Sequence, residues 1–157
     1  MDRLLNFLTE DSIVLEMKST TKEEAIEELI DVVVARGELA ARDKPAVLKA
    51  VMEREKRGST GLGYGIAVPH VRESPHVKGL TGAFGRSGDG IPFNAVDGNR
   101  VDLVFLILGG EGTGDDHALL LRKLAKLREN EHFLRFLRDA RDVPSAADVI
   151  REMTGSV

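Results

Sequence analysis

The feature that most constrains the fold is a β-like apolar run, Val-Asp-Leu-Val-Phe-Leu-Ile-Leu, which extends from Val101 to Leu108. Asp97-Gly98 precedes this run and is typical of a turn. A strand with apolar side chains at consecutive positions must be covered on both faces. Its uninterrupted part, Leu103 to Leu108, reaches only about a third of the ~20 residues that a membrane helix requires. The run therefore predicts the central strand of a sheet rather than a membrane span.

Shorter strand-like segments precede the central run. In residues 12–17 every second residue is apolar, which is typical of a strand with one face against a core. Residues 66–68 form a short apolar run that ends in Pro69-His70, and residues 80–85 are a further predicted strand. The chain therefore supplies enough strands for a sheet around the central run.

Helical patterns alternate with these strands. Thr20-Thr21-Lys22-Glu23 has the spacing of a capping box with Thr20 as the N-cap residue, and apolar residues then recur at helical spacing. Gly37 is expected just beyond the end of this helix, because glycine adopts the left-handed conformation at little cost. Four more helices are predicted: from Pro45, from His117 after a cap at Asp115 or Asp116, over residues 133–137, and from Ser145 as N-cap residue.

Length favours a single domain. A chain of 157 residues buries roughly two-thirds of the surface that its unfolded state exposes, so one core suffices without a disulfide or a structural metal. No internal repeat, linker or low-complexity tract interrupts the alternation of helices and strands. The sequence therefore predicts one α/β domain over residues 1–157, with helices on both sides of a mixed β-sheet.

Composition excludes several classes of function. The absence of cysteine excludes thiol nucleophiles, disulfides and cysteine-based metal sites, and it fits a reducing compartment, so a cytoplasmic location is expected. A net charge of −4 with scattered basic residues gives no patch for nucleic acid. No membrane insertion or secretion is expected, because the amino terminus lacks a basic-then-apolar pattern.

The segment from Gly58 to Gly65 reads Gly-Ser-Thr-Gly-Leu-Gly-Tyr-Gly, and its four glycines predict an irregular loop of close approach. It does not match a nucleotide-binding motif: the third glycine of the dinucleotide fingerprint is misplaced, the segment follows a helix, and no Gly-Lys-Ser/Thr follows it. A plain turn remains an alternative. Small residues directly before a histidine also give another macromolecule access to that histidine.

Two of the four histidines stand out by context. His70 comes directly after a predicted strand, where α/β folds tend to place ligand chemistry, although a histidine there also serves simply to cap the strand. His117 is predicted in the first turn of a helix, where free N–H groups attract an anion and keep the imidazole neutral. A solvated surface histidine is an equal alternative for His117. His76 and His132 are predicted to be solvated, and a zinc site from His70 and His76 lacks a third ligand and the usual helical spacing.

Residues 53–70 read Glu-Arg-Glu-Lys-Arg-Gly-Ser-Thr-Gly-Leu-Gly-Tyr-Gly-Ile-Ala-Val-Pro-His. This segment resembles the signature of the fructose/mannitol-type IIA components of the bacterial phosphoenolpyruvate-dependent phosphotransferase system. The resemblance covers most of the chain, including Ile91-Pro-Phe93, the central strand and a second histidine that opens a late helix. Val71 and Ala118 depart from the family pattern, which often has Gly after the first histidine and Leu after the second.

The resemblance implies a mannitol-type fold and a histidine phosphocarrier. In the family, the histidine at the position of His70 is phosphorylated, and Arg54 and His117 occupy the positions that stabilise the phosphoryl group. A neutral imidazole is a competent nucleophile for this reaction, and no cofactor or metal is expected. We also expect backbone N–H groups of the glycine-rich segment to bind the phosphoryl group, at Thr60, Gly61, Gly63 and Gly65.

The resemblance implies an HPr-type phosphocarrier protein as the donor and leaves two functions open. The wording of residues 54–61 and the stand-alone length favour a nitrogen-regulatory IIA protein, whose phosphorylation changes how it recognises a kinase or a transporter. The alternative is a IIA component that passes the phosphoryl group to a IIB partner for fructose- or mannitol-type sugar uptake. An inert scaffold is disfavoured because His70, Arg54 and His117 are all present.

Overall fold

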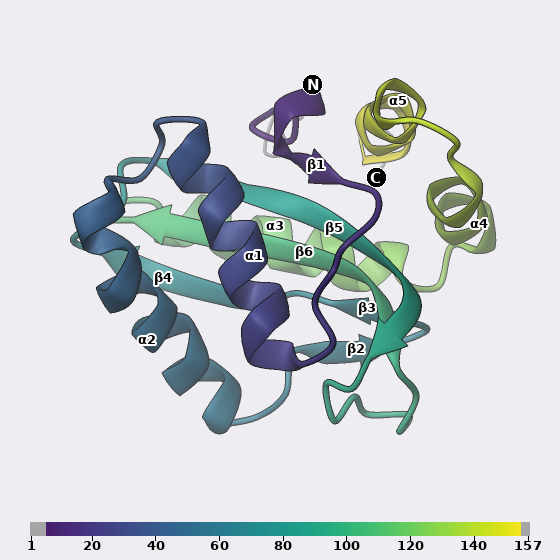
Figure 1. Cartoon of the computed structure of the whole chain (residues 1–157), viewed down its shortest axis with the longest axis horizontal. Coiled ribbons are helices and arrows are strands. Elements are labelled where there is room, and N and C mark those ends of the chain that lie inside the picture. The colour runs from purple at the N-terminus through teal and green to yellow at the C-terminus, as the bar shows by residue number, and fades with distance from the viewer. Residues whose placement is uncertain (1–5, 155–157) are drawn as a thin grey trace.

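Strand β6 (Val101–Gly110) lies at the centre of the sheet in the computed structural model, which describes residues 6–154 (Figure 1). It pairs antiparallel with β5 (Leu80–Ile91) along one edge. Along the other edge it pairs in parallel with β3 (Ile66–Ala67) and then with β4 (His70–Ser74). The prediction of a central strand in a mixed sheet is therefore confirmed. Two further strands complete the sheet: β1 (Ile13–Val14) beside β5, and β2 (Gly61–Gly63) beside β3.

Side chains of β6 enter two separate cores, because successive residues of a strand point to opposite faces. Leu103 and Phe105 belong to one core, and Val104 and Leu106 belong to the other. All four side chains are fully buried. This two-sided burial explains why the sequence of β6 is apolar at consecutive positions.

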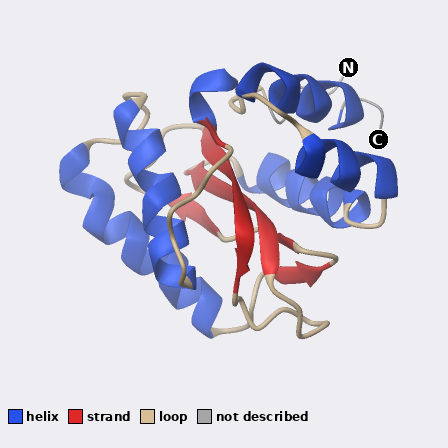
Figure 2. Ribbon diagram, turned by 45° about the vertical axis from the view of Figure 1, so that its right-hand side comes forward, coloured by secondary structure: helices blue, strands red, loops and turns tan. Residues whose placement is uncertain are grey.

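Helices cover both faces of the sheet, as Figure 2 shows. Helices α1 and α2 pack on the face that contains Val104, whereas α3, α4 and α5 pack on the face that contains Phe105. This arrangement confirms the predicted α/β fold with helices on both sides. The helices are α1 (Lys22–Ala35), α2 (Lys44–Lys56), α3 (Gly114–Leu127), α4 (Glu131–Asp139) and α5 (Val143–Thr154), with short 3₁₀-helices at Glu10–Ser12 and Ala41–Asp43.

Helix α1 begins one residue later than predicted, and its N-cap residue is Thr21 rather than Thr20. The Thr21 hydroxyl accepts the N–H of Glu24 at 3.2 Å, and the Glu24 carboxylate accepts the N–H of Thr21 at 3.2 Å. That carboxylate also accepts the N–H of Thr20 at 3.0 Å, so both threonines bind the same glutamate. The predicted end at Gly37 is confirmed, with a φ of 79°.

Two other predicted caps are wrong. Helix α3 has Thr113 as its N-cap residue, without a side-chain cap, and Asp115 and Asp116 lie inside its first turn. Helix α5 begins before Ser145, because the carboxylate of Asp142 already accepts the N–H of Ser145 at 2.8 Å. In both cases a residue earlier in the chain takes the terminal position.

The strands also differ from the prediction in extent. Strand β1 has two residues rather than residues 12–17, because Ser12 ends a 3₁₀-helix, while β5 extends well beyond residues 80–85. The glycine-rich segment is not irregular throughout: β2 and β3 form a tight antiparallel pair. Tyr64 and Gly65 turn the chain between them with φ values of 57° and 82°. The glycine-rich segment therefore forms a β-hairpin rather than an irregular loop.

The predicted domain of residues 1–157 includes residues 1–5 and 155–157, which lie outside the described residues. Within residues 6–154, none of the helices combines the length and the apolar character that crossing a membrane requires.

Candidate functional site

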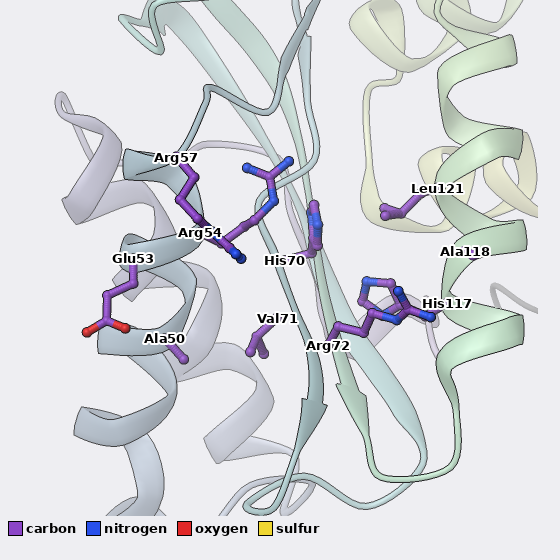
Figure 3. A pocket seen from close by; sticks show the side chains of 10 residues that line it. All are labelled: Ala50, Glu53, Arg54, Arg57, His70, Val71, Arg72, His117, Ala118 and Leu121. Atoms are coloured by element: carbon purple, nitrogen blue, oxygen red, sulfur yellow. The ribbon is translucent and has the colours of Figure 1, made fainter.

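A cleft of about 730 Å³ lies between α2 and α3, and β4 forms its floor (Figure 3). Figure 3 shows His70 between Arg54 of α2 and Arg57, which directly follows α2, on one side and His117 of α3 on the other. The structure therefore brings together the three residues predicted to act in catalysis, His70, Arg54 and His117. The lining residues are Ala50, Glu53, Arg54, Arg57, His70, Val71, Arg72, His117, Ala118 and Leu121.

His70 is the first residue of β4, and the two-residue break between β3 and β4 places it at the cleft. Pro69 has no N–H to donate to β6, although its carbonyl still accepts the N–H of Ile107 at 3.0 Å. Pairing with β6 resumes at His70 itself. The sequence predicted a strand end before His70 but not the strand that begins there.

The His70 ring is oriented by one hydrogen bond. Its Nδ1 lies 2.8 Å from the carbonyl oxygen of Val68. A carbonyl oxygen only accepts hydrogen bonds, so Nδ1 carries the hydrogen and Nε2 of the neutral ring keeps its lone pair. The nitrogen that is free to react is therefore Nε2.

Burial lowers the pKa of His70 below its usual value of 6.5. The hydrogen bond to Val68 opposes this shift, whereas the guanidinium groups of Arg54 and Arg57 lower the pKa further, and Glu55 raises it. The neutral imidazole is therefore the dominant form at pH 7. This is the protonation state that a nucleophile needs.

His117 lies in the first turn of α3, as predicted, but it is not a solvated surface residue. Only 1% of its surface is exposed, and its ring centroid lies 5.3 Å from that of His70. Neither ring nitrogen has a hydrogen-bond partner within the described part of the chain. Burial lowers its pKa to about 4, and the charges of His70 and Arg72 act in the same direction. His117 therefore presents a neutral ring with a free N–H to the site.

Gly109, near the end of β6, makes room for His117. A Cβ atom at this position would lie 2.7 Å from Nδ1 of His117 and 3.0 Å from Oγ1 of Thr113. Real Cβ atoms do not approach a side chain this closely, so any larger residue would displace the ring or the start of α3. The glycine is required by packing rather than by a positive φ.

Arg54 lines the cleft, and its Nη1 donates to the carbonyl oxygen of Gly58 at 2.8 Å. Two further arginines that were not predicted from the sequence, Arg57 and Arg72, line the same cleft. Spacing carried a signal for both. Arg57 follows Arg54 by three positions, at the C-cap of α2, and Arg72 follows His70 by two positions on one strand face.

The four residues predicted to bind the phosphoryl group are absent from the lining of the cleft. Thr60 is buried and binds Glu55 through its N–H and its hydroxyl. Gly61 packs against Ala95, where a Cβ atom would meet the Ala95 Cβ at 2.7 Å. These positions are used to fold the chain tightly rather than to line the cleft. Gly63 and Gly65 likewise pack beside other groups, Asp97 and the Arg138–Asp102 pair respectively.

The two departures from the family pattern, Val71 and Ala118, both line the cleft beside the histidines. His76, in contrast, pairs with Asp43 at 3.3 Å and is not among the lining residues. No group of three or more His, Asp or Glu side chains among residues 6–152 is arranged to hold a metal ion.

Comparison with known proteins identifies the family of this chain. The model of the family described as "Phosphoenolpyruvate-dependent sugar phosphotransferase system, EIIA 2" matches residues 6–153. The chain therefore belongs to this family, whose members are phosphotransfer components. Fold and cleft thus define a IIA-type phosphotransfer protein.

Particular relatives divide between two activities. A nitrogen regulatory protein of Bradyrhizobium diazoefficiens is 33% identical over 147 residues, 94% of each chain. A fructose-specific EIIA component of Haloferax volcanii is 38% identical over 141 residues, 90% of each chain. The crystal structure of the nitrogen regulatory protein IIA-Ntr from Neisseria meningitidis superposes with a TM-score of 0.82 at 32% identity, covering 92% of this chain and 97% of that one. The chain is thus similar to both nitrogen regulatory and fructose-specific IIA proteins.

Proposed function

We propose that this protein is a histidine phosphocarrier that accepts a phosphoryl group from an HPr-type protein on Nε2 of His70. The observation that carries the proposal is the hydrogen bond from His70 Nδ1 to Val68, which leaves Nε2 as the free nitrogen at a cleft lined by arginines. Three guanidinium groups and a neutral histidine around one imidazole suit the binding of a phosphoryl group better than that of an uncharged ligand.

Phosphoryl transfer to His70 needs no general base. The lone pair of Nε2 attacks the phosphorus, the bond from phosphorus to the donor's histidine nitrogen breaks, and its electron pair returns to the donor ring. The hydrogen on Nδ1 of His70 stays in place during the transfer. The Val68 carbonyl oxygen accepts this N–H and thereby stabilises the positive charge that develops on the ring.

The remaining cleft residues act on the oxygens of the phosphoryl group. Arg54, Arg57 and Arg72 supply permanent positive charge to the equatorial oxygens, whose charge dominates the transition state. His117 donates one hydrogen bond, because its buried ring stays neutral. Thr60 and the neighbouring glycines take no direct part in this scheme.

Phosphorylation of the purified protein tests the proposal. After incubation with phosphoenolpyruvate, enzyme I and an HPr-type carrier, we expect one acid-labile phosphoryl group on His70, located by mass spectrometry under alkaline conditions. His70→Ala removes the acceptor nitrogen and should abolish the label. His132→Ala is the matched control, because His132 is exposed on α4 and does not line the cleft. Label retained in His70→Ala would contradict the proposal.

We propose a nitrogen-regulatory role for the phosphorylated and free forms, because one relative with this name matches over 94% of both chains. A solved structure with this name also superposes on this chain with a TM-score of 0.82. The 38% identity to a fructose-specific component favours, as a second candidate, transfer to a IIB partner. Two assays separate these roles. Rapid transfer from phosphorylated His70 to a purified IIB protein indicates sugar uptake, whereas affinity for a kinase or transporter that changes on phosphorylation indicates regulation.

A further inference from the structure

A buried carboxylate lies behind the cleft and has no part in the transfer scheme above. Glu55, near the end of α2, exposes only 5% of its surface. Lys22, at the start of α1, places its Nζ 3.0 Å from Oε2 of Glu55. Burying a charged pair is costly unless further hydrogen bonds satisfy its oxygens. The groups that bind the carboxylate oxygens of Glu55 therefore indicate the role of the Lys22–Glu55 pair.

Both carboxylate oxygens of Glu55 bind Thr60. The backbone N–H of Thr60 donates to Oε2 at 3.2 Å, and its hydroxyl donates to Oε1. Thr60 is itself only 4% exposed, so these bonds are shielded from water. One side chain of α2 thereby fixes both hydrogen-bond donors of the residue that precedes β2.

The hydrogen bonds continue from Thr60 to the imidazole of His70. The carbonyl oxygen of Thr60 accepts the N–H of Val68 at 3.1 Å. The carbonyl oxygen of Val68 in turn accepts Nδ1–H of His70 at 2.8 Å. Each link fixes the orientation of the next, so a continuous series joins Lys22, Glu55, Thr60, Val68 and His70.

We propose that Glu55 is a positioning residue for His70. Together with Lys22 it anchors Thr60, which holds the Val68 peptide, and the Val68 carbonyl keeps His70 in the form with hydrogen on Nδ1 and Nε2 free for the phosphoryl group. Partners that orient a reacting imidazole from behind commonly matter nearly as much as the groups that touch the substrate. The role of Nε2 as acceptor rests on the proposed function, whereas the orientation of the ring does not.

Charge alone predicts the opposite effect on the reaction. A negative carboxylate near His70 repels an incoming phosphoryl group, so a purely electrostatic Glu55 would slow phosphorylation and its neutralisation would accelerate it. Among the described residues, the other charged or titratable groups that line the cleft with His70 are Glu53 and Arg54 of α2, Arg57 directly after α2, Arg72 of β4 and His117 of α3. They remain unchanged in a Glu55 variant, so the sign of the rate change separates positioning from charge.

Glu55→Gln tests the proposal with two measurements. Long-range proton–nitrogen NMR of the wild type should show the His70 ring with hydrogen on Nδ1, and the variant should show a mixture of both ring forms. Phosphorylation by an HPr-type carrier should slow by about tenfold or more, since misplacing a reacting group costs at least that much. Glu28→Gln is the matched control, because the Glu28 carboxylate also accepts a backbone N–H and a hydroxyl, both from Ser19, and does not line the cleft. This control should leave the His70 ring form and the rate unchanged.

Thr60 variants keep the test decisive if Glu55→Gln does not fold. Thr60→Val removes the hydroxyl and should reproduce the mixture of ring forms and the slower rate, whereas Thr60→Ser retains the hydroxyl and should behave as the wild type. The proposal would be overturned if whichever of Glu55→Gln and Thr60→Val folds had the His70 ring form and the phosphorylation rate of the wild type. Faster phosphorylation of Glu55→Gln would also overturn it. A wild type that shows hydrogen on Nδ1 but takes no phosphate on His70 would contradict the proposed function instead, and the NMR comparison alone would then decide the positioning role.

Discussion

At the scale of single residues, the site depends on how two imidazoles are held differently. His70 has its Nδ1 fixed by Val68, which leaves one nitrogen free for nucleophilic attack. His117 has no such partner among the described residues, and burial keeps its ring neutral with one N–H, which in the proposed function donates to a phosphoryl oxygen. The surroundings of each ring therefore decide its role.

Gly109→Ala is expected to disturb His117 without touching a charged group. The added Cβ would lie 2.7 Å from Nδ1 of His117, so the ring must move. Overpacking of this kind costs about 1–3 kcal/mol of stability, and we expect phosphorylation of His70 to slow as well. Urea unfolding and the rate of phosphorylation by an HPr-type carrier measure both effects.

Gly88→Ala is the control for this substitution. Gly88 is also in a strand and has no positive φ, and a Cβ atom added there would meet no atom within 4 Å among the described residues. The stability and phosphorylation rate of this variant should match those of the wild type. Equal behaviour of the two alanine variants would show that Gly109 has no role in placing His117.

At the scale of secondary structure, the sequence predicted the type of each long element better than its ends. The spacing of apolar residues predicted α1 and β6 correctly. A helix with one buried face and a strand with two buried faces each have a characteristic spacing within a short segment. The ends depend on which of two neighbouring polar residues reaches a free N–H. Thr20 and Thr21 have equivalent chemistry, and only their geometry selects Thr21.

Thr21→Ala is expected to destabilise the protein more than Thr20→Ala. Loss of an N-cap hydroxyl costs about 1 kcal/mol, because the N–H of Glu24 then lacks its acceptor. Thr20 only adds bonds to the Glu24 carboxylate, so its replacement should cost less than about 0.5 kcal/mol. Equilibrium unfolding in urea measures both changes. The reverse order would support the capping box that the sequence predicted, with Thr20 as the N-cap residue.

At the scale of the whole molecule, the fold is a sheet held between two helical layers, and the cleft forms where one helix of each layer faces the other across β4. Helix α2 supplies Arg54, α3 supplies His117, and β4 supplies His70 and Arg72. The site therefore depends on both layers being packed in place at once.

Leu103→Ala and Leu106→Ala test whether both layers contribute to stability. The two side chains are fully buried but point to opposite faces of β6, so each substitution should cost about 2–5 kcal/mol. Leu119→Ala is the control, since Leu119 on α3 is 39% exposed and should cost less than about 1 kcal/mol. A central-strand variant that loses no more stability than the control would show that its face is not packed. Thermal and urea unfolding provide the measurement.

The sequence alone determined the alternation of helices and strands, the two-sided burial of β6 and the candidacy of His70 and His117. These are local properties, because the spacing of apolar residues, the residues typical of turns and the position of each histidine can be read within short segments. Local spacing relates Arg57 to Arg54 and Arg72 to His70, but only the tertiary structure decided that these two pairs line one cleft and that Thr60 turns inward to Glu55. Such proximities arise when elements from different parts of the chain pack together, and no local pattern specifies which side chains then meet.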